Sequence, residues 1–96
     1  MNELFARQAA VIRTLITDYR DARFGLDTLV QRLEGITEAI GIDGWEDAVF
    51  PIVLAMEQVN AYAVETKSSL SEANKKVIDE SLRDLEILIK RYESQS

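Results

Sequence analysis

The stretch from Trp45 to Thr66 constrains the fold of this chain more than any other. Drawn as a helix, it has apolar residues on nearly every side and contains no Lys or Arg. A helix that is apolar all round is normally buried between other helices. Four acids interrupt the stretch, which argues against a membrane span. We therefore expect it to be the central helix of a small helical bundle.

Apolar residues at helical spacing predict three further helices. The first is expected over Asn2 to Arg23. The second should begin at an N-cap, Asp27, and close at Gly41, while the last should begin after an N-cap at Ser71. Four helices joined by short loops are typical of an up-down bundle. The predicted fold is all-α, a small antiparallel four-helix bundle in one domain over residues 1–96.

Two features are expected to shape the central helix. Asp43 and Glu46 have the spacing of a capping box, in which each side chain bonds to the backbone of the other residue. Pro51 follows about two turns later, and it has no amide proton and crowds the preceding turn. We therefore expect this helix to be kinked or split near Pro51.

The composition argues against several classes of function. Among 96 residues there are 17 acids and 11 bases, a formal net charge of −6, whereas nucleic-acid binding needs patches of Lys and Arg. The chain has no Cys and no His, so the commonest metal ligand and the commonest general base are both missing. We expect no catalytic residue, no metal, no cofactor, no nucleic acid and no membrane contact. The N-terminus does not have the pattern of a secretory signal, so the expected location is the cytoplasm.

Paired carboxylates are the one remaining candidate for chemistry. Glu34 and Glu38 are one helical turn apart, and so are Glu80 and Asp84. Di-metal sites in helical bundles combine Glu with His, which this chain lacks. Acid pairs on a helix are mostly solvated, so we expect these pairs to lie on the surface.

The distribution of charge gives the best indication of function. The span from Leu33 to Thr66 has seven acids and no base, whereas the remainder has ten acids and eleven bases. Acids beside an aromatic anchor suit a basic protein partner. The residues expected to bind such a partner are Glu34, Glu38, Asp43, Trp45, Glu46, Asp47, Phe50 and Glu57. The alternative is an ordinary surface, in which Asp43 and Glu46 only cap a helix, Trp45 is core and the other acids solubilise the chain.

The first part of the chain also resembles a known family. Leu15 to Ile36 reads LITDYRDARFGLDTLVQRLEGI, with Tyr19 near a helix end, a short turn, and a second helix led by Leu26 and Asp27. This resembles the colicin D immunity-like proteins, which also guard against toxins of contact-dependent growth inhibition, although Gly25 is displaced from their usual pattern. The resemblance implies a helical bundle that binds a cognate tRNA-cleaving nuclease and masks its basic active site with carboxylates.

The leading hypothesis is therefore an immunity protein, a monomer or weak homodimer, that occludes a basic toxin nuclease. Reversing Glu34, Glu38 and Asp47 to Lys should then abolish binding without unfolding the bundle. A second hypothesis is a structural module that homodimerises, or binds another protein, through Phe50, Leu54 and Val64. A small enzyme or metal protein is the third.

Overall fold

The computed structural model describes residues 3–67 and 69–94 as four helices. They are α1 (Glu3–Arg20), α2 (Leu26–Glu38), α3 (Trp45–Thr66) and α4 (Glu72–Ser94). The described residues contain no strand, which confirms the predicted all-α class and the number of helices. None of these helices is long and apolar enough to cross a membrane.

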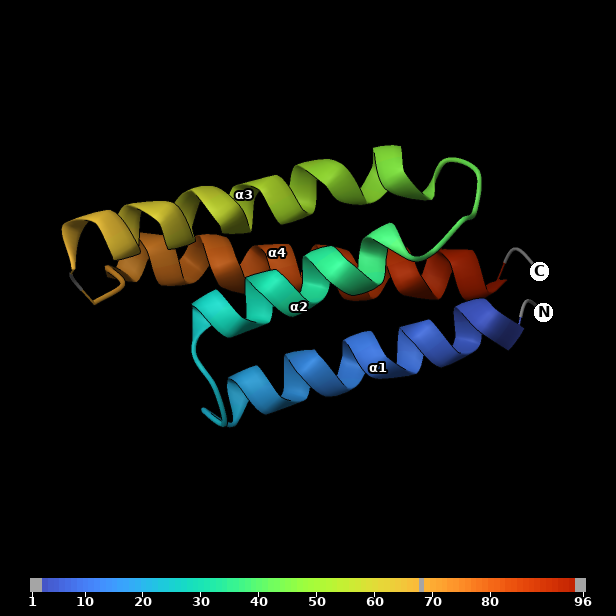
Figure 1. Cartoon of the computed structure of the whole chain (residues 1–96), viewed down its shortest axis with the longest axis horizontal. Coiled ribbons are helices and arrows are strands. Elements are labelled where there is room, and N and C mark those ends of the chain that lie inside the picture. The colour runs from blue at the N-terminus through green and yellow to red at the C-terminus, as the bar shows by residue number, and fades with distance from the viewer. Residues whose placement is uncertain (1–2, 68, 95–96) are drawn as a thin grey trace.

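The four helices lie side by side around a common core (Figure 1). α1 contacts α2 and α4, and α3 contacts the same two helices, so α1 and α3 are diagonal to each other. The start of α1 and the end of α4 lie at the same end of the molecule (Figure 1). Two sides can therefore be distinguished, one formed by α2 and α3 and the other by α1 and α4.

Each helix contributes one apolar stripe to the core, at the three- and four-residue steps of an amphipathic helix. The largest completely buried side chains are Ile12, Ile16, Leu29, Leu33, Trp45, Met56, Leu82, Leu85 and Ile89. The stripes predicted from the sequence for α1, α2 and α4 are the ones that the structure buries.

α3 departs from the prediction, because it is not buried on all sides. Val49, Val53 and Met56 face the core, whereas Phe50 and Val64 on the opposite face keep 64% and 61% of their surface exposed. The expectation was wrong because apolar content alone does not tell how many neighbours a helix has. With α2 and α4 as its only helical neighbours in the described part of the chain, α3 leaves its outer face uncovered.

Pro51 does not split α3, which is one continuous helix from Trp45 to Thr66. The predicted split is therefore wrong, and the predicted kink stays a prediction. Pro51 lies on the exposed side of the helix. The carbonyl of Asp47, which has no amide donor at Pro51, can then bond to water, so the proline is tolerated.

The helix ends agree only partly with the prediction. Ser71 caps α4 as expected, since its Oγ accepts a hydrogen bond from the amide of Asn74 at 3.1 Å. α2 begins one residue earlier than predicted, at Leu26, so Asp27 is not its N-cap. The carboxylate of Asp27 instead accepts hydrogen bonds from the side chains of Gln31 (3.1 Å) and Asn60 (3.0 Å), the second of which joins α2 to α3.

The predicted capping box at the start of α3 is also wrong. Gly44 occupies the N-cap, with φ +82°, and no side chain caps the helix there. Only glycine adopts this left-handed conformation without strain. A β-carbon on Gly44 would also lie 3.3 Å from the hydroxyl of Tyr92. Asp43 is thereby moved out of the capping position.

The remaining differences concern where α1 and α2 end. α1 ends at Arg20, and Ala22, rather than the predicted glycine, takes the left-handed conformation after it. α2 ends at Glu38, before Gly41. Asn2, at which the first helix was predicted to begin, lies outside the described residues.

Candidate functional site

A groove between α2 and α3 brings together most of the acids that the sequence analysis selected. Its volume is about 450 Å³. We call it the acidic groove and define it by the residues that line it, Glu34, Thr37 and Glu38 from α2 and Glu46, Val49, Phe50, Val53 and Glu57 from α3. Four of the eight side chains are carboxylates, two from each helix.

Helical spacing explains how these side chains share one opening. Glu34 and Glu38 are four residues apart and therefore lie one above the other on α2. On α3, Glu46, Phe50 and Glu57 follow at steps of four and seven residues, which also places them on one face. The groove thus runs along the line where the two helices meet.

The floor of the groove is made by residues that also belong to the core. Val49 and Val53 are buried, and so is Thr37. The hydroxyl of Thr37 donates to the carbonyl of Leu33 at 2.7 Å, so its polar atom is satisfied inside the protein. These three residues were not selected from the sequence. Their only signal was their position between the acids on the same helix faces.

Like charges face each other across the groove. The pKa of Glu34 is raised above its ordinary value, first because its carboxyl group hydrogen-bonds to that of Glu57. Partial burial and the nearby negative charges of Glu57 and Glu38 act in the same direction. The free protein therefore holds two carboxylates close together that would each be stabilised by a cation.

No base of the described residues neutralises these acids. The ion pairs of residues 3–67 and 69–94 all involve other carboxylates. The one base within α2 and α3 is Arg32, whose guanidinium lies over the ring of Phe24 at 5.1 Å from its centre. Arg32 is therefore engaged away from the groove.

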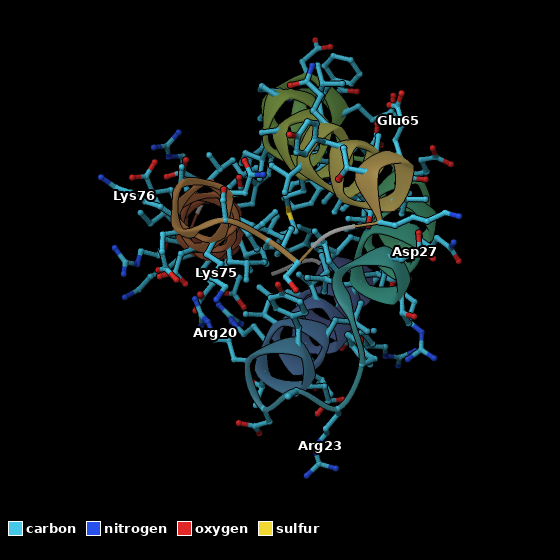
Figure 2. All side chains as sticks on the ribbon, turned by 90° about the vertical axis from the view of Figure 1, so that its left-hand side faces the viewer. Arg20, Arg23, Asp27, Glu65, Lys75 and Lys76 are labelled. Carbon is cyan, nitrogen blue, oxygen red and sulfur yellow. The ribbon has the colours of Figure 1, made fainter. Side chains whose placement is uncertain are left out.

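The opposite side of the molecule has a different charge arrangement. α1 and α4 together carry eight acids and eight bases, whereas α2 and α3 carry seven acids and one base. Arg13 pairs with Glu93 at 2.5 Å and Arg20 with Glu86 at 2.9 Å, so α1 and α4 are joined by opposite charges. Figure 2 shows Arg20, Lys75 and Lys76 on the α1–α4 side and Asp27 and Glu65 on the α2–α3 side.

Five of the eight predicted partner-binding residues line the groove, namely Glu34, Glu38, Glu46, Phe50 and Glu57. Asp43 and Asp47 instead line a separate hollow formed by residues of the 40–47 segment, which Glu46 borders as well. The charge pattern along the sequence identified the region, but only the pairing of two helices selects which acids meet.

Trp45 is a correction, because the structure buries it completely. Its indole Nε1 donates to the carbonyl of Thr37 at 3.2 Å, and its ring packs edge-on against Phe5 and Tyr92 with 5.3 Å between ring centres. It therefore cannot contact a partner at the surface. The alternative interpretation, that Trp45 is core, is the one that the structure supports.

Neutralising Glu34 is expected to stabilise the free protein. Because the pKa of Glu34 is higher in the folded than in the unfolded state, its ionisation opposes folding at any pH above that folded-state value. Glu34→Gln should therefore raise the free energy of unfolding at neutral pH by about 0.2–1 kcal/mol, the range for exposed charge pairs. As the pH falls through the pKa of Glu34, the wild-type carboxyl becomes protonated and the advantage of the variant should disappear.

Urea unfolding followed by circular dichroism, at neutral and at acidic pH, measures this difference. The matched control is Glu80→Gln on α4, an exposed acid. Equal effects of the two substitutions at neutral pH would show that carboxylate repulsion across the groove is absent.

The described residues offer no metal centre, since no group of three or more Asp and Glu side chains in them is arranged to hold an ion. Comparison of the chain with protein-family models, curated proteins and solved structures finds no match. The chemistry of the acidic groove is therefore the basis for assigning a function.

Proposed function

We propose that this protein is an immunity protein that binds a basic toxin nuclease and neutralises it by covering its active site with the acidic groove. The partner would be the tRNA-cleaving domain of a contact-dependent growth inhibition toxin, met in the cytoplasm, as the resemblance to colicin D immunity-like proteins implies. The proposal includes the antiparallel bundle arrangement. It assigns no enzymatic activity, cofactor or nucleic-acid contact to the chain.

The observation that carries the proposal is the set of four groove carboxylates without a base among the described residues to neutralise them. A nuclease that cleaves RNA must present Lys, Arg or His to phosphate groups. Carboxylates placed along a groove can occupy the same positions as those phosphates and pair with the same cations. The partner would then be inhibited because its substrate site is filled.

The proposal also accounts for the repulsion within the groove. Glu34 and Glu57 lie close together, at a cost to the stability of the free protein. Binding sites commonly retain such unfavourable arrangements because the bound state needs them. A guanidinium or ammonium group from the partner would remove the repulsion, so the free energy lost in folding is recovered on binding.

Inhibition of a purified nuclease domain tests this function. The domain is the C-terminal part of a large toxin encoded immediately upstream, and the assay is cleavage of tRNA. We expect complete inhibition at equimolar protein at low salt, and weaker inhibition as ionic strength rises and screens the charges. Undiminished cleavage in the presence of excess protein, or a neighbouring gene that encodes no basic domain, would contradict the proposal.

The second candidate function is the structural module that homodimerises. It is favoured by the exposure of Phe50 (64%) and Val64 (61%), which is large for apolar side chains on one helix. Sedimentation separates the two functions. A tight dimer that does not inhibit the nuclease favours the module, whereas a monomer that inhibits it favours the immunity protein.

A further inference from the structure

The outer face of α3 carries an apolar stripe that no other described element covers. The stripe consists of Phe50, Leu54, Ala61 and Val64, at steps of four, seven and three residues. Phe50, Ala61 and Val64 are exposed and Leu54 is half-buried. The stripe is 14 residues long, so it extends about 21 Å along the helix axis, roughly four turns.

The other exposed large apolar side chains are scattered. Leu4 and Val11 lie on α1, and Val77 and Ile87 on α4. Single apolar residues on a surface are normal and need no partner. A continuous row along one helix is different, because contiguous exposed apolar surface bordered by polar groups marks an interaction site.

Acids border the stripe on both flanks. Glu46 and Glu57 lie on the flank toward α2, and Asp47 and Glu65 on the flank toward α4. α3 contains no Lys or Arg. An occupant of this face must therefore be apolar in its centre and positively charged at both edges.

We propose that the outer face of α3 is the docking surface for an amphipathic basic helix of the protein partner. This rests on the proposed function, because the partner is the basic toxin, and it adds a contact beyond the acidic groove. The apolar side chains of the partner helix pack on the stripe, and its Lys and Arg side chains pair with the flanking carboxylates. An amphipathic helix laid on an apolar surface is a common mode of protein recognition.

The charges argue against two other occupants. In a symmetric pair the same patch of each copy faces the other. A dimer through this stripe would therefore place the flanking acids of two α3 helices together with no base from either. A membrane surface carries anionic lipids, which these acids repel.

The probe for this surface is a synthetic peptide of about 18 residues, with Leu on one helical face and Lys on the other. A second peptide has Glu at every Lys position. Binding is measured by fluorescence anisotropy, and its location by amide chemical shifts of the ¹⁵N-labelled wild-type protein. We expect the Lys peptide to bind, with shifts concentrated on α3, and the Glu peptide not to bind.

The test variant is Leu54→Ser with Val64→Ser, since neither side chain lines the acidic groove. The matched control is Val11→Ser with Ile87→Ser, which removes exposed apolar side chains from α1 and α4. We expect affinity for the Lys peptide to fall about tenfold or more in the test variant, or about 1.4 kcal/mol, and to be unchanged in the control. Circular dichroism checks that both variants are folded, and the wild-type shifts decide the result if one is not.

Three outcomes would overturn the proposal. They are equal affinities of the two double variants, shifts spread over other helices, and a wild-type dimer that the Leu54 and Val64 substitutions dissociate, which would identify the occupant as a second copy. The nuclease assay keeps the two proposals apart. If the Leu54 and Val64 variant inhibits as well as the wild type, the docking surface is wrong and the proposed function stands.

Discussion

Replacing Trp45 by alanine is expected to destabilise the protein by about 3–5 kcal/mol, the usual loss when a large aromatic side chain is removed from a core. Its ring is completely buried, and it packs against Phe5 from α1 and Tyr92 from α4. Its indole also donates to the carbonyl of Thr37 at the end of α2. One side chain thus joins all four helices, and small domains have only about 5–15 kcal/mol of stability in total.

Urea unfolding followed by circular dichroism measures this loss. The matched control is Phe50→Ala, which removes an aromatic ring from the same helix at a position that is 64% exposed, and which should change stability little. Should the alanine variant fail to fold, Trp45→Phe provides a milder test. It keeps much of the packing but leaves the buried carbonyl of Thr37 without this donor, at a cost of about 1–3 kcal/mol. Similar losses for Trp45→Ala and Phe50→Ala would contradict the role assigned to Trp45.

The second large effect is expected on binding. Changing Glu34 and Glu38 together to Lys should weaken the complex with the toxin nuclease by about 100-fold or more, equivalent to about 2.7 kcal/mol. Each reversal replaces an attraction to the partner with a repulsion, and pairs desolvated at an interface are worth several kcal/mol. The fold should survive, because a Lys at position 34 would face Glu57 and replace a repulsion with an ion pair.

The matched control for this reversal is Glu80→Lys with Asp84→Lys. Those two acids have the same four-residue spacing, but they lie on α4, outside the acidic groove. The reversal changes net charge by the same amount, so an effect of overall charge alone would appear equally in both variants. Affinity for the nuclease is measured by titration calorimetry at low salt. Equal losses in the two double variants would show that the groove has no special role.

How far the sequence predicts this structure depends on whether a feature is local. The bounds of α3 were predicted correctly, because polar and glycine-containing segments delimit its apolar run. The cap at Ser71 was also predicted correctly. The caps at Asp27 and Asp43 were not, because Gly25 and Gly44 allow the backbone to enter each helix at a different residue.

Features that depend on several helices could not be predicted in the same way. Trp45 is core because Phe5 and Tyr92 meet it from distant parts of the chain, and no pattern near Trp45 indicates those neighbours. The acidic groove was predicted as a region, since a count of charges along the chain suffices for that. The pairing of Glu34 with Glu57 depends on the register of α2 against α3, which spacing within one helix does not contain.

The unequal division of charge between the two sides gives the molecule a permanent electric dipole across its long axis. α1 and α4 are balanced in charge, and nearly all the net negative charge lies on α2 and α3. A positively charged body approaching in solution therefore exerts a torque that rotates this protein until α2 and α3 lead. Because the Debye length is about 8 Å at physiological ionic strength, this alignment acts only over the last few water layers before collision.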